Sequence, residues 1–81
     1  MLTVEFTIEP FIEGAPGAHV TAAVAAVEKR GLIVEFGPFG SSFSVLKDEL
    51  PEAVADLMRA AYANGATFVS VDVGSMDDSQ A

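Results

Sequence analysis

The first strand-like segment of the chain, residues 2–9, alternates strictly between apolar and polar side chains. Every even position is apolar, and every odd position carries a hydroxyl or a carboxylate. Successive side chains of a strand point to opposite faces, so this pattern predicts one apolar face that packs on a core and one polar face. The polar face consists of Thr3, Glu5, Thr7 and Glu9. A sheet built on this strand is expected to be covered on one side and open on the other.

Two later segments have the spacing of amphipathic helices. The first begins near Pro16 and ends at Gly31, which suits a left-handed cap. The second begins at Pro51, a favourable residue in a first helical turn, and ends at Asn64 and Gly65. The apolar positions recur at i, i+3, i+4 and i+7; they are Val20, Ala23, Val24 and Val27 in the first helix and Val54, Leu57, Met58 and Ala61 in the second.

Three further strands are expected at residues 32–36, 42–46 and 67–73, because short alternating runs lie between glycine- and proline-rich turns. The side chains expected on the covered side are Leu32, Val34 and Phe36, then Phe43 and Val45, then Thr67, Val69, Val71 and Val73. The open face would then carry Thr3, Glu5, Thr7, Ile33, Glu35, Ser42, Ser44, Phe68, Ser70 and Asp72.

The resulting order, βαββαβ, predicts an α+β domain of two layers, with both helices on one face of an antiparallel sheet. This is the ferredoxin-like arrangement, in which the usual strand order is 4-1-3-2. The first and third strands then lie at the centre of the sheet. We expect one domain over residues 1–74, followed by an acidic, flexible tail at residues 75–81.

The charge balance argues against several classes of partner. The chain has 12 acidic and 4 basic side chains, which gives a formal net charge of −8. Nucleic-acid binding requires several Lys or Arg side chains on phosphates, so we expect neither nucleic acid nor an anionic membrane surface as a partner. A cationic ligand, or a neutral one with hydrogen-bond donors, is the better electrostatic match.

Length and composition add three expectations. The absence of cysteine excludes disulfides and thiolate metal sites. With neither a signal-peptide pattern nor an apolar run near about 20 residues, the chain is expected to be cytoplasmic. Hydrophobic residues make up 51% of the sequence, whereas so short a chain buries only about 60% of its extended surface. We therefore expect a homo-oligomer in which a second subunit covers part of the apolar surface.

Three acidic residues, Glu5, Glu35 and Asp72, share the open face if the strands pair as expected. One interpretation is a solvated face without a ligand. Alternatively, a carboxylate on a central strand, once covered, hydrogen-bonds a ligand or balances its positive charge, since a covered carboxylate without a partner is costly. No Ser-His-Asp or metal-binding constellation can be assembled from the spacings, so no catalytic residue is predicted.

Three other features have two interpretations each. The segment at residues 37–42 places Phe39 between glycines; it is either a tight turn or a clasp in which Ser41 and Ser42 hold a polar ring while Phe39 stacks on it. Phe68 is interpreted as a subunit contact in preference to a stacking platform. His19 is expected to be structural or solvent-facing, because it has no partner at metal-ligand spacing.

The order of these motifs resembles the small thiamine-binding proteins of the YkoF-like type. The resemblance covers residues 2–74: it includes the Val-x-Phe-x-Ile-x-Pro start that ends at Pro10, the Gly-Pro-Phe-Gly-Ser turn at 37–41, and the Ala-Asn-Gly-Ala stretch at 63–66. The family more often has Met where this chain has Phe39, Thr where it has Ser41, and an Ile-Glu-Gly run in the third strand. The resemblance implies a ferredoxin-like fold in dimers or tetramers that binds thiamine or its hydroxymethylpyrimidine moiety without catalysis.

The leading hypothesis is therefore a cytoplasmic, homodimeric or homotetrameric binding protein for thiamine or a related pyrimidine, with no cofactor. In this hypothesis Glu5 and Glu35 accept hydrogen bonds, Thr7 and the two serines position the ring, and Phe39 or Phe68 stacks on it. The predicted ligand-binding residues are Glu5, Thr7, Glu35, Phe39, Ser41 and Ser42, and the predicted interface residues are Ile33, Phe68 and Ser70. The alternative is a structural or regulatory oligomerisation module without a small-molecule ligand.

Overall fold

Four strands and two helices follow one another in the order that the sequence predicts. The structure, a computed structural model, describes residues 1–10, 17–37 and 40–75. The elements are β1 (Leu2–Glu9), α1 (Ala18–Glu28), β2 (Glu35–Gly37), β3 (Gly40–Val45), α2 (Leu50–Ala63) and β4 (Phe68–Ser75). Neither helix is long and apolar enough to cross a bilayer, within the part of the chain that the structure describes.

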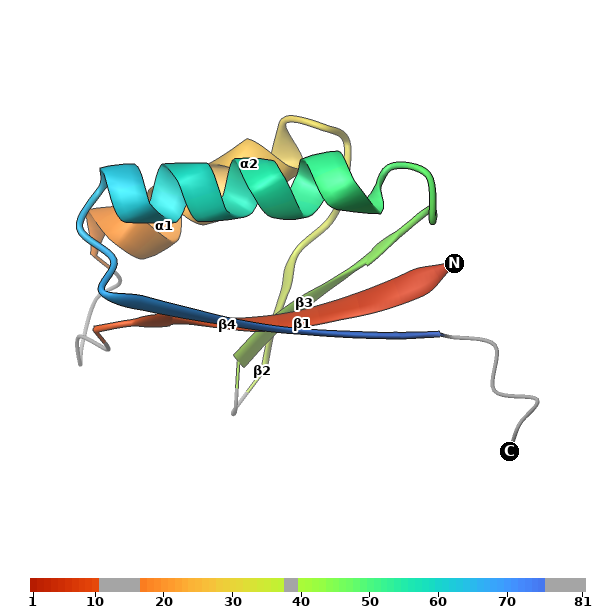
Figure 1. Ribbon diagram of the computed structural model, residues 1–81, viewed down its shortest axis with the longest axis horizontal. Coiled ribbons are helices and arrows are strands. Elements are labelled where there is room, and N and C mark those ends of the chain that lie inside the picture. The colour runs from red at the N-terminus through yellow and green to blue at the C-terminus, as the bar shows by residue number, and fades with distance from the viewer. Residues whose placement is uncertain (11–16, 38–39, 76–81) are drawn as a thin grey trace.

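The strands form one antiparallel sheet in the order β2-β3-β1-β4, which is the predicted order 4-1-3-2 seen from its other end. Both helices lie on the same side of the sheet, and none of the described segments covers the opposite side (Figure 1). This arrangement confirms the ferredoxin-like α+β fold. The central position of β1 places Glu5 between two partners, Ser42 on β3 and Asp72 on β4.

The core lies between the sheet and the helices. In β1, Val4, Phe6 and Ile8 are buried there and Leu2 is half-buried, while the polar residues Glu5, Thr7 and Glu9 are exposed, as the alternation predicts. The rings of Phe6 and Phe43 lie in contact, with their centroids 5.9 Å apart. The buried apolar side chains are Val4, Phe6, Ile8, Ala23, Val24, Val27, Val34, Phe43, Val45, Ala53, Leu57 and Ala61.

The helices follow the predicted spacing with one adjustment. In α2, Leu57 and Ala61 are buried as predicted, whereas Val54 and Met58 are half-buried and Ala53 is buried in addition. The close approach of α2 is to α1, the other helix of the layer. Gly31 ends the α1 segment with a φ of 87°, a left-handed conformation that favours glycine, as the sequence predicts.

The prediction for the second strand is partly wrong. β2 is shorter than expected: it begins three residues later and ends one residue later, and Phe36, predicted to face the core, is 68% exposed. Phe36 pairs with Ser41, which in turn pairs with the buried Phe6, so all three share one row. Because β2 is an edge strand, Phe36 lies at the end of this row that the helices do not cover. Val34, just before the strand, is buried instead.

The last strand extends further than predicted. β4 runs to Ser75 and so includes the first residue of the predicted tail, while residues 76–81 lie outside the described residues. Val69 and Val71 pack against the core as predicted. Val73, which was predicted to face inward, is 46% exposed because β4 forms the second edge of the sheet.

Candidate ligand-binding pocket

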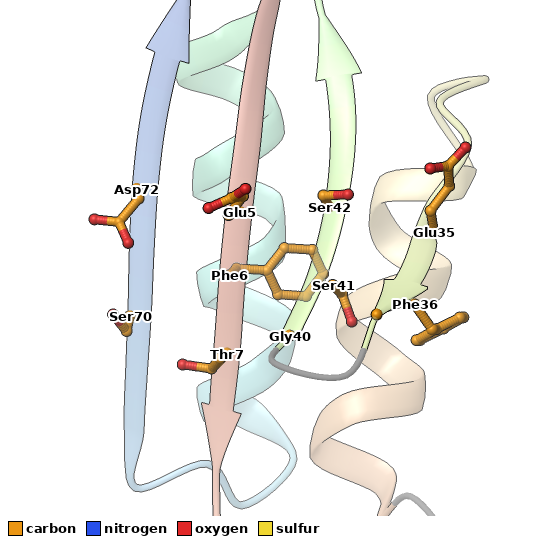
Figure 2. Close-up of a pocket in the computed structure, with 11 residues that line it drawn as sticks. Glu5, Phe6, Thr7, Glu35, Phe36, Gly40, Ser41, Ser42, Ser70 and Asp72 are labelled. Atoms are coloured by element: carbon orange, nitrogen blue, oxygen red, sulfur yellow. The ribbon is translucent and has the colours of Figure 1, made fainter.

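A hollow of about 430 Å³ lies on the open face, spread over all four strands (Figure 2). Pockets that bind small molecules usually have volumes of about 300–1,000 Å³. The side chains that line it are polar, acidic or aromatic, together with two glycines. The lining residues are Glu5, Phe6, Thr7, Glu35, Phe36, Gly37, Gly40, Ser41, Ser42, Ser70 and Asp72. The hollow therefore has the size of a small-molecule site and a predominantly polar wall.

Two glycines explain why this part of the sheet is hollow. Gly37 and Gly40 pair with each other where β2 meets β3, so no side chain stands at that point. Gly40 has a φ of 154°, and a Cβ on it would lie 3.0 Å from both the backbone oxygen of Phe6 and the Cγ2 atom of Thr7. Such contacts are tighter than most Cβ contacts in proteins, and the φ value is one that other residues rarely adopt. Glycine is therefore favoured at position 40, where β3 lies close against β1 beneath the hollow.

Four polar side chains form a straight row across the sheet. The strand register places Glu35 opposite Ser42, Ser42 opposite Glu5, and Glu5 opposite Asp72. Figure 2 shows these side chains at the same level on four adjacent strands. Side chains directly opposite each other in a sheet have Cβ atoms about 4.5–5.5 Å apart, and like charges at that distance destabilise the sheet. The adjacent carboxylates of Glu5 and Asp72 therefore favour a bound cation.

A second set of groups supplies hydroxyls. Thr7 lies opposite Ser70 on the open face, whereas Ser41 lies between Phe6 and Phe36 in the row that points to the helix side. In Figure 2 the side chains of Thr7 and Ser70 are neighbours on β1 and β4, one step along the sheet from the carboxylate row. Hydroxyls both donate and accept hydrogen bonds, so this end of the pocket accommodates ligand atoms of either kind.

The positive charge of the chain is held in the helix layer. The Nε atom of Arg30 donates to Asp56 at 2.7 Å, Arg59 donates to the same carboxylate at 3.0 Å, and Arg30 lies 3.5 Å from Glu49. The hydrogen bond from Arg30 lowers the pKa of Asp56, and the same bond raises the pKa of Arg30. None of the residues that line the pocket is basic. The electrostatic potential in the pocket is therefore negative and comes from its three carboxylates, Glu5, Glu35 and Asp72.

Most residues predicted to bind a ligand lie together in this hollow. Glu5, Thr7, Glu35, Ser41 and Ser42 all line it, whereas Phe39 lies outside the described residues. The predicted interface residues are divided. Ser70 also lines the pocket, while Phe68 and Ile33 stand elsewhere, exposed by 55% and 76%.

Sequence reasoning missed several lining residues. Phe36 was assigned to the core, although it is 68% exposed and is one of the residues that line the pocket. Gly40 was assigned only to a turn, and its close approach to β1 could not be read from the sequence. Asp72 was recognised as a neighbour on the open face but not as a site residue. Gly37 and Gly40 themselves were the available sequence signal for a depression in the sheet surface.

His19 has a structural role, as predicted. Its ring is only 4% exposed, and its Nε2 atom donates a hydrogen bond to the Pro10 carbonyl at 2.6 Å. This bond fixes the start of α1 to the chain segment that follows β1. Across residues 1–10, 17–37 and 40–75, no group of three or more His, Asp or Glu side chains is placed to hold a metal ion.

No family model matches the sequence, and no curated protein matches it either. Two solved structures share the fold. A domain of unknown function, DUF77, from Bacillus cereus is 22% identical, with 89% of this chain aligned to 70% of that one and a TM-score of 0.63. A hypothetical protein from Methanocaldococcus jannascii is 23% identical, with 90% of this chain aligned to 75% of that one and a TM-score of 0.61. At these identities the likeness supports the fold alone.

Proposed function

We propose that this chain is a non-catalytic, homo-oligomeric binding protein of the cytoplasm, with thiamine or its hydroxymethylpyrimidine moiety as ligand. The observation that carries the proposal is a pocket of about 430 Å³ with three carboxylates, four hydroxyl-bearing side chains and no basic residue. Thiamine joins a cationic thiazolium ring to an aminopyrimidine ring. It therefore offers a fixed positive charge and hydrogen-bond donors to a wall that supplies negative charge and acceptors.

The row of carboxylates suggests how such a ligand would lie. The thiazolium ring would sit beside Glu5 and Asp72, where two like charges face each other across β1 and β4. The aminopyrimidine would then reach toward β2 and β3. There Glu35 can accept from its amino group and Ser42 can bond a ring nitrogen. Phe36 is not part of this arrangement, because it shares a row with the buried Phe6 and so points to the helix side of the sheet.

The family resemblance supports the same ligand independently of the charge argument. The small thiamine-binding proteins that the sequence resembles have the ferredoxin-like fold, and this chain has that fold. Five of the six residues proposed from the sequence come from three strands, and they line one pocket. We assign no reaction to the site, because its serines have no His, Lys or Cys beside them among the lining residues to activate a hydroxyl.

Calorimetric titration with thiamine, and separately with hydroxymethylpyrimidine, tests the proposal. We expect saturable heat with both ligands and tighter binding of thiamine, since only thiamine carries the fixed cation. Added salt should reduce that difference, because exposed charges are screened within about 10 Å at 0.1 M. If a folded protein gives no heat with either ligand at millimolar concentration, the proposal is wrong.

One observation favours the alternative, an oligomerisation module without a small-molecule ligand. Phe68 and Ile33 expose large apolar side chains that a protein partner would cover. Under this alternative, Phe68→Asp converts the oligomer to monomer while neither ligand produces heat. A ligand titration that gives heat with the wild-type protein excludes the alternative, whatever the mass of the Phe68→Asp variant.

A further inference from the structure

The two edges of the sheet differ in length. β2 has three residues, whereas β4, at the other edge, has eight, and each of these eight pairs with β1 on its inner side. Within the described part of the chain, no strand pairs with the outer side of residues 68–74. Proteins usually protect such an edge with Lys, Pro, a bulge or a short strand. The sequence of β4, Phe-Val-Ser-Val-Asp-Val-Gly-Ser, contains neither Lys nor Pro.

Apolar side chains along the same edge are partly exposed. Val73 on the helix side is 46% exposed and Phe68 on the open side is 55% exposed. Val69 and Val71 are half-buried against the core. A neighbouring strand would cover the first two side chains and satisfy the outward backbone groups in one contact.

We infer that β4 pairs with β4 of a second copy of this chain, antiparallel, about a twofold axis through Val71. This inference specifies the homo-oligomer of the proposed function and rests on that part of it. In this register Val71 lies opposite the partner's Val71, and Val69 lies opposite the partner's Val73. Ser70 lies opposite the partner's Asp72, and Phe68 lies opposite the partner's Gly74.

The chemistry of β4 selects this register. Branched side chains face each other on the helix side, and on the open side a Ser hydroxyl can donate to a carboxylate. Centring the axis on Asp72 would place two carboxylates directly opposite, which is unfavourable, and centring it on Ser70 would place Phe68 opposite a carboxylate. A shift by one residue would set apolar side chains beside polar ones. Only the axis at Val71 gives compatible pairs along residues 68–74.

The pairing would bring a second subunit to the pocket. The twofold axis stands perpendicular to the sheet, so the two copies share one continuous sheet with all helices on the same side. Ser70 and Asp72 line the pocket from β4. Across the new contact, the Asp72 carboxylate gains the hydroxyl of the partner's Ser70 as a neighbour. The two pockets then lie on either side of the axis, and each one is completed by a side chain from the other copy.

Cysteine crosslinking tests the register directly, because the chain has no cysteine of its own. Directly opposed residues of antiparallel strands have Cα atoms about 4.5–5.5 Å apart, within the about 4.4–6.8 Å that a disulfide spans. We expect Val71→Cys to form a disulfide-linked dimer under mild oxidation. Ser70→Cys and Asp72→Cys are matched controls. Each alone should stay uncrosslinked, since diagonal neighbours are about 7–8 Å apart, but an equal mixture of the two should crosslink.

Light scattering supplies the second measurement. Val73→Lys, at an exposed position, should reduce the mass from dimer to monomer, and Val73→Thr should leave it unchanged. The inference is overturned if Val71→Cys fails to crosslink in a sample that circular dichroism shows to be folded, or if Asp72→Cys crosslinks alone. The two proposals can fail separately. Crosslinking at Val71 without heat from thiamine supports the β4 pairing and refutes the ligand proposal. Heat from thiamine without crosslinking supports the ligand proposal and refutes the pairing.

Discussion

Replacing Glu5 by Gln is expected to weaken ligand binding and to stabilise the empty protein. Glu5 is the central acidic residue of the pocket, flanked across the sheet by Ser42 and Asp72. A hydrogen bond to a charged group contributes about 1.5–3 kcal/mol, and a neutral one about 0.5–1.5 kcal/mol. Glu5→Gln keeps the shape and removes the charge. We therefore expect a loss of about 1–3 kcal/mol in thiamine affinity, which is about 5- to 150-fold in Kd.

The expected gain in stability comes from the register. Glu5 and Asp72 are directly opposed, and a like-charged pair in that position destabilises a sheet by about 0.2–1 kcal/mol. Removing one of the two charges relieves that repulsion. Urea unfolding of the variant without ligand should show a slightly higher midpoint than the wild-type protein. A damaged fold would instead lower both stability and affinity, so the opposite signs separate a binding role from misfolding.

Glu9→Gln is the matched control for this measurement. Glu9 lies on the same strand and the same exposed face, but it pairs with Phe68 and does not line the pocket. Both variants change the net charge by the same amount. If calorimetry shows that the two variants lose the same thiamine affinity, the loss comes from the change in net charge, and Glu5 does not contact the ligand. An unchanged affinity in Glu5→Gln would remove that residue from the site altogether.

Three further predictions follow from the geometry. Gly40→Ala should lower the unfolding free energy by about 1–3 kcal/mol, because the φ of 154° is unfavourable for alanine and its Cβ would collide with β1. Gly74→Ala, where a Cβ meets nothing within 4 Å, is the control for urea unfolding, and equal losses would contradict the argument. Asp56→Asn should destabilise most near neutral pH. Since the hydrogen bond from Arg30 lowers the pKa of Asp56, the wild-type advantage is complete above the ordinary value of about 3.9 and is lost as pH falls through the lowered one. Unfolding midpoints that differ by a constant amount across pH would refute this. Phe36→Leu should leave thiamine affinity unchanged, because Phe36 shares a row with the buried Phe6 and points to the side of the sheet opposite the carboxylates; calorimetry showing weaker binding would contradict this placement.

The sequence predicted best those elements whose burial follows a simple period. The alternation in β1 predicted that Val4, Phe6 and Ile8 face the core, and all three are buried. The same alternation failed at Phe36, which occupies an equivalent position in the pattern. The difference is position within the sheet: Phe6 lies on a central strand beneath the helices, and Phe36 lies on the edge. A periodic pattern specifies a face, but it does not specify how far the covering layer extends.

The candidate site was predictable to a similar depth. Glu5, Thr7 and Ser42 could be placed on one face from the alternation alone, and they do line one pocket. That Glu5 lies opposite Asp72 could not be predicted without the strand register, which is set by contacts between segments far apart in the sequence. The role of Gly40 could not be predicted, because it depends on how close β3 lies to β1. A Cβ on Gly40 would lie 3.0 Å from the backbone oxygen of Phe6, and no local sequence pattern reveals that distance.

The shortness of β2 has a consequence for how copies of this chain assemble. A contact related by a twofold axis is self-complementary and closes on itself, whereas edges that pair head to tail generate filaments. Pairing through β4 uses the long edge of both copies at once. The joined sheet then ends on both sides in a three-residue strand that carries Glu35, which is a poor template for adding another strand. If β4 pairs as inferred above, edge-to-edge addition of strands stops at two copies, because neither end of the joined sheet offers a long edge.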